Sequence, residues 1–264
     1  MNRLSMNVLE EDLQDAAAFC REQDLGIEVT AFAFPEKLDG DVDSLVDSHR
    51  AAVEGIHPLS FHGPFFDLIA TSPDPRIVDV ARLRHEKAIA AAAALGAGYY
   101  IAHTNYTPVI RNPRYRDGWT GRMLDFWMPL ADRAAGSGMV ICLENLWEPV
   151  PDTLQQLLEK ADHDSLRMTL DNGHVLVFSR LSTTEWVERL GRFIVHCHLH
   201  DNMGEMDEHL PVGEGIEDWQ KLIRALKRHA PDALLVAESD GLADNMISIE
   251  RLKELMKNER DGQR

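Results

Sequence analysis

Hydrophobic and polar positions follow two alternating periods along the chain. Short apolar or period-two stretches predict strands, whereas apolar residues spaced three and four apart predict helices. The predicted strands cover residues 3–9, 27–33, 58–62, 98–103, 139–144, 167–171, 193–200 and 233–238. The predicted helices cover residues 11–23, 75–96, 152–162, 183–192, 218–230 and 247–259. Strands and helices are therefore expected to alternate from one end of the sequence to the other.

This alternation predicts the fold class. Strands that alternate with helices favour a parallel sheet covered by helices. Eight such units in 264 residues match the size of a (β/α)8 TIM barrel. A doubly wound open sheet is the alternative, but it usually has fewer strands, and the glycine-rich turn expected after its first strand is missing. No linker or change of composition divides the sequence, so we predict one α/β barrel domain over residues 1–264.

Composition and charge narrow the class of partner. The formal net charge is −17, which disfavours duplex DNA, RNA and anionic membrane surfaces. The three cysteines, Cys20, Cys142 and Cys197, have no metal-ligand spacing, and no apolar run is long enough to cross a membrane. We therefore expect a cytoplasmic protein that acts on a small molecule, with neither nucleic acid nor a membrane as partner. A homo-oligomer remains compatible with the sequence.

Side chains that can bind metals end six consecutive predicted strands. They are His62, His103, Glu144, Asp171, the group His196, His198 and His200, and Glu238, with His174 one turn beyond Asp171. The carboxyl ends of barrel strands meet at one mouth, where active sites of TIM barrels lie. So many imidazoles and carboxylates would repel or desolvate one another unless a cation neutralised them. We expect one to three divalent ions, zinc or manganese foremost, with cobalt, iron or magnesium as alternatives.

The alternation of side chains within the seventh predicted strand supports this placement. Val195, Cys197 and Leu199 share one face, which suits packing against helices, so the three histidines of this strand should point into the barrel. His200 lies nearest the rim and is expected to orient a ligand or the substrate. Five other histidines fall in helices or loops away from strand ends and are predicted to lie on the surface: His49, His57, His85, His163 and His229.

The segments around these positions resemble a known superfamily. They read "SFHGPFFDL", "IAHTN", "LENLWEP", "LDNGH", "HLHDNMGEMDEHLPVGEG" and "AESDG". Together they resemble the xylose-isomerase-like TIM-barrel superfamily, which includes sugar and sugar-phosphate isomerases and epimerases and the endonuclease IV group. The resemblance covers nearly the whole sequence. It implies a metal site at the carboxyl ends of the strands, but two patterns inside the superfamily imply different chemistries.

The isomerase and epimerase pattern implies one metal ion held by Glu144, Asp171, His198 and Glu238, with His174 in contact with substrate. The two glutamates would then move a proton next to a carbonyl, and the ion would polarise the carbonyl. No arginine follows His198 at the place where ketose epimerases of the superfamily hold the sugar's end.

The endonuclease IV pattern adds ligands for further zinc ions. Its counterparts here are His62, His103, His174, Asp207 and His209, which completes nine ligand positions by residue type. Such a site would favour hydroxide attack on a phosphodiester. Glu208 stands where that group resembles a basic residue, and the acidic charge also disfavours DNA.

Further residues are candidates for substrate binding. Trp147 and Glu148 follow Glu144 and could pack on a sugar face and bind a hydroxyl. Arg111, Arg114 and Arg116 lie in residues 105–119 and are suited to phosphate or carboxylate, although a solvated surface loop explains them equally well. We predict a sugar or sugar-phosphate isomerase or epimerase. The alternatives are a multinuclear zinc phosphoesterase and a non-catalytic metal-binding barrel.

Overall fold

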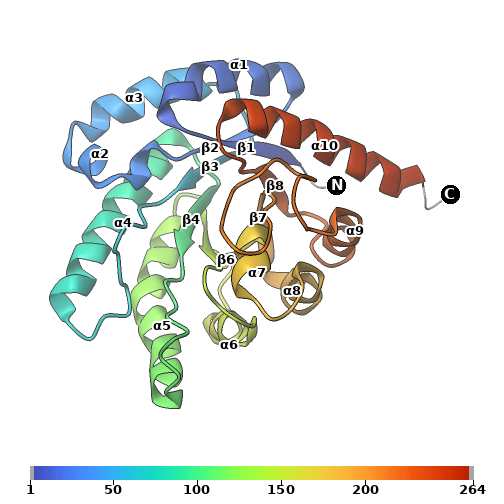
Figure 1. Cartoon of the computed structure of the whole chain (residues 1–264). Coiled ribbons are helices and arrows are strands. Elements are labelled where there is room, and N and C mark those ends of the chain that lie inside the picture. Colours follow the sequence, from blue (N-terminus) through green and yellow to red (C-terminus); the bar gives the residue numbers. More distant parts are fainter. Residues whose placement is uncertain (1–2, 262–264) are drawn as a thin grey trace.

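The computed structural model describes residues 3–261, and within them parallel strands close into a barrel in chain order (Figure 1). The strands are β1 Leu4–Val8, β2 Gly26–Val29, β3 Leu59–His62, β4 Tyr99–His103, β5 Val140–Glu144, β6 Leu166–Asp171, β7 Ile194–Leu199 and β8 Leu234–Ala237. Strand β8 pairs with β1 and so closes the ring. The TIM barrel predicted from the sequence is confirmed.

Helices surround this barrel (Figure 1). Their bounds are α1 Leu13–Gln23, α2 Pro35–Asp39, α3 Val42–Val53, α4 Pro75–Leu95, α5 Pro113–Ala135, α6 Asp152–Ala161, α7 Asn172–Phe178, α8 Thr183–Leu190, α9 Trp219–His229 and α10 Leu242–Asp261, with 3-10 turns η1 Glu10–Asp12, η2 Ala31–Ala33 and η3 Gly191–Phe193. No helix within the described range is long and apolar enough to cross a membrane.

The core lies between the barrel and its helices, because each strand turns apolar side chains outwards. Cys197 and Leu199 of β7 are fully buried in this layer, together with Trp119 and Trp127 of α5 and Trp186 of α8. The inward positions of β7 are His196 and His198. The strand therefore separates an apolar outer face from a polar inner face, as side-chain alternation requires.

Three details differ from the sequence-based expectation. Strand β2 ends at Val29 rather than at residue 33, because residues 31–33 form the 3-10 turn η2. Helices α2, α3 and α7 were not predicted. Residues 105–119 are not one loop, because α5 begins at Pro113, and the Asn112 side chain caps it by accepting a hydrogen bond from the Arg114 amide at 2.9 Å.

Two histidines predicted to lie on the surface are buried instead. His49 is 2% exposed, and its Nδ1 lies 2.9 Å from the Leu45 carbonyl oxygen. His85 is 3% exposed, and its Nδ1 lies 2.8 Å from the Tyr100 hydroxyl. Both occupy the inner faces of their helices, where a hydrogen bond compensates the buried polar atom. His57 is exposed, as predicted, and His163 and His229 are half-buried.

Candidate metal centre

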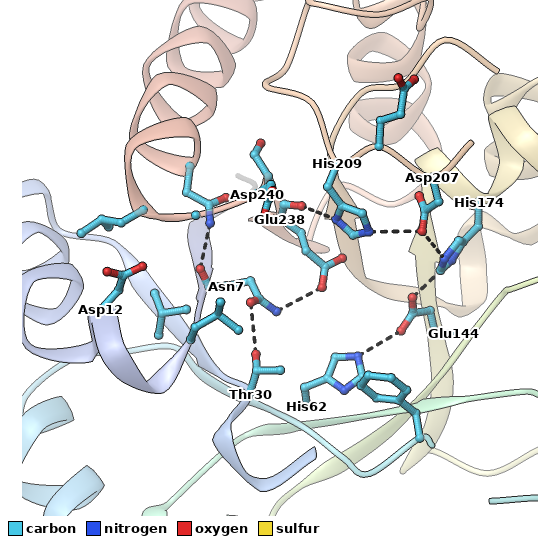
Figure 2. Close-up of a pocket in the computed structure, with 18 of the residues that line it drawn as sticks. Asn7, Asp12, Thr30, His62, Glu144, His174, Asp207, His209, Glu238 and Asp240 are labelled. Atoms are coloured by element: carbon cyan, nitrogen blue, oxygen red, sulfur yellow. Dashed lines mark hydrogen bonds and ion pairs between the residues drawn. The ribbon is translucent and has the colours of Figure 1, made fainter. Parts of the chain in front are cut away.

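A cavity of about 500 Å³ opens where the carboxyl ends of the strands meet. Figure 2 shows side chains from several strands and from the loops that follow them pointing into it. The charged or imidazole-bearing residues that line it are Asp12, His62, His103, Glu144, His174, Asp207, Glu208, His209, Glu238 and Asp240. No lysine or arginine of the described residues lines this cavity. Its wall is therefore strongly acidic.

His198 does not line this cavity itself but contacts two residues that do, and it is fully buried. Its Nδ1 is 3.0 Å from Glu238 Oε2 and 3.4 Å from Glu144 Oε1. Asp171 Oδ2 lies 3.9 Å from the same nitrogen. The four residues assigned to the isomerase pattern thus come from four strand ends and converge on one point.

Two further histidines approach the other oxygen of Glu144. His62 Nε2 and His103 Nε2 lie 3.6 Å and 3.4 Å from Glu144 Oε2. The ring of Phe65 stacks on His103, with centroids 4.7 Å apart, and so restricts its orientation. These contacts place the ends of β3, β4 and β5 around one buried carboxylate.

His174 enters the site from the first turn of α7. Asp171 caps this helix, because its Oδ1 accepts a hydrogen bond from the His174 amide at 2.7 Å. Nδ1 of His174 lies 2.9 Å from the Asn145 carbonyl oxygen and 3.4 Å from Glu144 Oε1. Its Nε2 lies 3.2 Å from Asp207 Oδ2. His174 therefore bridges the strand-end residues and the loop that follows β7.

That loop, residues 201–216, brings two predicted ligands back over the mouth. An antiparallel bridge between Asp201 and Leu210 folds the loop onto itself. His209 Nε2 then lies 3.2 Å from Asp207 Oδ2, and His209 Nδ1 lies 2.7 Å from the Glu238 carbonyl oxygen. His200, which directly follows β7, is fully buried, and its Nε2 lies 3.3 Å from Asp171 Oδ2.

The charges in the cluster stabilise one another. Burial alone would lower the pKa of His198, but the carboxylates around it, led by Glu238 and Glu28, raise it well above its ordinary value. Burial would likewise raise the pKa of Glu144, yet the neighbouring histidines, led by His198, hold it well below its ordinary value. Burial lowers the pKa of His103 to about 3. Positive charge is therefore favoured at the centre of the cluster and disfavoured at His103.

The residues present fit a divalent cation. His198 Nδ1 and Glu144 Oε2 are buried and make no hydrogen bond, although both face groups of the cluster. Five groupings of described residues have ligand atoms close enough to share an ion: His62, Glu144 and His198; Glu144, Asp171 and His174; Asp171, His198 and Glu238; His200, His209 and Glu238; and Glu28, His196 and His198. Mixed imidazole and carboxylate donors suit zinc, manganese, iron or cobalt. An ion there would satisfy buried atoms that are otherwise costly.

The residues predicted to bind substrate are spread more widely. Trp147 is 41% exposed and is not among the residues that line the cavity. Glu148 is buried, and it accepts hydrogen bonds from Thr104 Oγ1 at 2.5 Å and from the Leu146 amide at 2.8 Å, so both oxygens have internal donors. The three arginines do not line the cavity and are exposed: Arg111, Arg114 and Arg116.

Glu28 and Asn7 are two polar residues of the site that were not predicted from the sequence. Glu28 in the middle of β2 is fully buried, and its Oε1 lies 2.9 Å from His198 Nε2. Asn7 of β1 donates hydrogen bonds from Nδ2 to Glu28 Oε1 at 2.9 Å and to Glu238 Oε1 at 3.1 Å. The sequence does contain an indication of Glu28. It is a lone glutamate between Ile27 and Val29, and side-chain alternation places it on the face of β2 opposite to theirs. Its mid-strand position lies outside the strand ends, where the sequence predicts the site.

Comparisons with known proteins show which sequences and structures this chain resembles. Residues 4–257 match the family described as xylose isomerase-like TIM barrel. The uncharacterized protein MJ1311 of Methanocaldococcus jannaschii is 26% identical, over 88% of this chain and 90% of the relative. The structure of TTHB071 protein from Thermus thermophilus, soaked with ZnCl2, is 26% identical, with a TM-score of 0.81 over 97% of this chain and 98% of that one.

A D-tagatose 3-epimerase-like protein has the same fold, with a TM-score of 0.80 and 22% identity over 99% of this chain and 100% of that one. The family match also extends along nearly the whole sequence and includes every strand of the barrel. The chain belongs to the xylose isomerase-like TIM barrel family.

Proposed function

We propose that the protein is a divalent-metal-dependent sugar isomerase or epimerase that moves a proton at a carbon next to a carbonyl. One observation carries the proposal: Glu144 and Glu238 lie within 3.4 Å of the same buried nitrogen, His198 Nδ1, and both line the open cavity. They come from β5 and from the end of β8, which are not neighbours in the barrel. A substrate bound between them would meet two carboxylates.

The chain's own groups have distinct tasks in this mechanism. One glutamate removes a proton from the substrate carbon, and the other returns a proton to that carbon or to its neighbour. When bound, a divalent ion would polarise the substrate carbonyl and stabilise negative charge on its oxygens. The residues that would hold it are Glu144, Asp171, His198 and Glu238. His174 can donate to a substrate oxygen, because it lines the cavity and has a raised pKa despite its burial.

The wall of the cavity favours an unphosphorylated sugar. Asp12, Glu208 and Asp240 line it beyond the cluster, whereas no described lysine or arginine does. A phosphate group would meet like charge there and no bidentate donor. The fold neighbours include proteins described as D-allulose 3-epimerase and D-psicose 3-epimerase. A neutral ketose or aldose is therefore the proposed substrate class.

The test measures proton exchange directly. Protein loaded with manganese or zinc is incubated in deuterium oxide with a panel of free ketohexoses, and with their phosphates for comparison. We expect solvent deuterium to enter the carbon next to the carbonyl of a free sugar. Glu144→Gln and Glu238→Gln should each reduce this incorporation at least about 100-fold, the size typical of a lost general base. Glu205→Gln, an exposed residue outside the cavity, is the matched control.

Deuterium incorporation that survives in both glutamine variants would contradict the proposed proton transfer. Metal binding is measured in parallel, because each variant also alters a proposed ligand. Supplying saturating metal separates weaker binding of the ion from loss of the proton-transfer group.

A multinuclear phosphoesterase is the second candidate, and one observation favours it. His62, His103, His174, Asp207 and His209 all line the same cavity as Glu144 and Glu238. Metal content of protein purified without added metal or chelator separates the candidates. Two or three zinc ions per chain, with hydrolysis of a phosphodiester, would support the phosphoesterase. A single exchangeable ion would support the isomerase, and bound metal without turnover of either substrate class would support the non-catalytic barrel.

A further inference from the structure

Behind the metal centre, the barrel interior holds a second layer of charge that does not line the cavity. Glu28, His196 and His198 are each fully buried. His198 Nε2, the nitrogen turned away from the cavity, lies 2.9 Å from Glu28 Oε1. The ring of His198 therefore stands between Glu28 at one nitrogen and the carboxylates of the proposed metal centre at the other.

We infer that Glu28 is a positioning residue for the metal centre: it accepts a hydrogen bond from His198 Nε2 and so keeps the Nδ1 lone pair of His198 directed at the ion. This inference rests on the proposed function, since it requires the ion that the function uses. A neutral imidazole carries one proton, and an acceptor at one nitrogen fixes the proton there and leaves the other nitrogen free for a metal. A carboxylate acceptor also makes the ring a stronger donor to the ion.

The surroundings of Glu28 hold its carboxylate in place. Asn7 Nδ2 donates to Glu28 Oε1 at 2.9 Å, and Asn7 Oδ1 accepts a hydrogen bond from Thr30 Oγ1 at 3.1 Å. His196 Nε2 lies 3.1 Å from Glu28 Oε2, and Nδ1 of the same ring lies 3.3 Å from Thr169 Oγ1. Hydrogen bonds to Oε1 from β1 and β7 and the nearby His196 ring thus restrict the carboxylate, although Oε2 itself makes no hydrogen bond.

A purely structural role accounts poorly for this arrangement. Burying a carboxylate is costly, its partners offset this cost only in part, and an apolar residue would fill the barrel interior at a lower cost. Glu28 is also connected to a second proposed ligand, because Asn7 Nδ2 donates to Glu238 Oε1 at 3.1 Å as well. The carboxylate of Glu28 is therefore placed to orient two proposed ligands, His198 directly and Glu238 through Asn7.

The test compares two variants by metal affinity. Glu28→Gln keeps an acceptor without charge, and Glu28→Leu removes the acceptor at similar volume. The zinc dissociation constant is measured by competition with a chromophoric chelator. We expect it to rise about 10- to 100-fold, as for other lost partners of metal-binding histidines, and more in Glu28→Leu than in Glu28→Gln. Ser5→Ala is the control, because Ser5 is fully buried, shares the inner face of β1 with Asn7, and has a hydroxyl that makes no hydrogen bond.

A spectroscopic measurement distinguishes positioning from general loss of structure. In the zinc-loaded wild type, long-range 1H–15N spectra should show His198 protonated at Nε2 and metal-bound at Nδ1, with a slowly exchanging Nε2 proton. In Glu28→Gln this Nε2 proton should exchange faster with solvent, and its signal should shift upfield. Urea unfolding of the metal-free variant measures separately how much the substitution destabilises the fold. If Glu28→Leu does not fold, Glu28→Gln alone carries the test.

The outcomes are distinct. An unchanged zinc dissociation constant in a folded Glu28→Gln variant, with an unchanged His198 signal, would overturn the inference and leave the proposed function intact. An additional ion bound by Glu28 and His196 would also overturn it. Wild-type protein that retains no divalent ion would overturn both proposals.

Discussion

The imidazole rings of His200 and His209 stack face to face, with centroids 3.9 Å apart and planes inclined by only 5°. One ring directly follows β7, and the other belongs to the loop of residues 201–216. Burial alone would lower the pKa of His209, but Asp207 and other carboxylates raise it to about 9. The stack therefore joins a charged ring in the loop to a buried ring at the base of the site.

We expect His209→Ala to loosen this loop without unfolding the barrel. The Asp201 and Leu210 amides donate to each other's carbonyl oxygens, both at 2.8 Å, and report directly on loop closure. Their hydrogen exchange should accelerate at least about tenfold, since local opening would cost at least about 1.4 kcal/mol less. Exchange in the strands should not change. His57→Ala removes an exposed histidine and serves as the control; equal protection in both variants would refute the role of the stack.

Metal affinity should increase with pH. His174 and His198 have pKa values well above the ordinary value, because burial, which lowers them, is outweighed by the surrounding carboxylates. The metal-free cluster therefore holds protons at neutral pH that an ion must displace. Each displaced proton strengthens zinc binding roughly tenfold per pH unit until the histidine has lost its proton. Titrations at pH 6, 7 and 8 test this, and a constant affinity would show that no proton is released.

His85 should make the fold sensitive to acid. Burial lowers its pKa from 6.5 to about 3, so the unfolded chain takes up a proton below pH 6.5 while the folded chain does not. The stabilising contribution is complete above pH 6.5 and is lost as the pH falls towards 3. Relative to His85→Gln, the wild type should lose about 2 kcal/mol of unfolding free energy between pH 7 and pH 5.

Urea unfolding of the two proteins at each pH measures this difference, and the loss of packing in the variant cancels in the comparison. A wild-type and variant pair with parallel pH profiles would contradict the buried, neutral state of His85. His57→Gln, at an exposed histidine, is the control for the substitution itself.

Helix α8 offers a prediction that is independent of the metal site. Ser182 Oγ accepts a hydrogen bond from the Glu185 amide at 3.3 Å, and the Ser182 amide donates to Glu185 Oε2 at 2.8 Å. This is a capping box, which satisfies two amides at the start of the helix. Ser182→Ala should lower the free energy of unfolding by about 1 kcal/mol and leave zinc affinity unchanged. A change in zinc affinity would show that α8 is coupled to the site.

The sequence contains most of the information about the barrel and the strand ends. Apolar periodicity located every strand, because buried strands differ sharply from the amphipathic helices between them. Helix α5 escaped prediction since Gly118, Gly121 and Pro129 interrupt its pattern, although tertiary packing of its buried tryptophans overrides their low propensity.

The site was only partly predictable for a different reason. His62, His103 and Glu144 were found because strand ends meet at one mouth in any TIM barrel. Glu28 lies in mid-strand, and only the packed structure shows which partners compensate its burial. His85 was misassigned because a helix position does not indicate by itself which face packs inward.

The pairing of β8 with β1 has a consequence for biosynthesis. The proposed metal centre draws on Asn7 of β1 and Glu28 of β2, and on Glu238 directly after β8. A nascent chain that has not yet released β8 from the ribosome can present histidines and carboxylates, but not the closed ligand set. An ion at the proposed centre would therefore meet its full ligand set only after β8 has paired with β1.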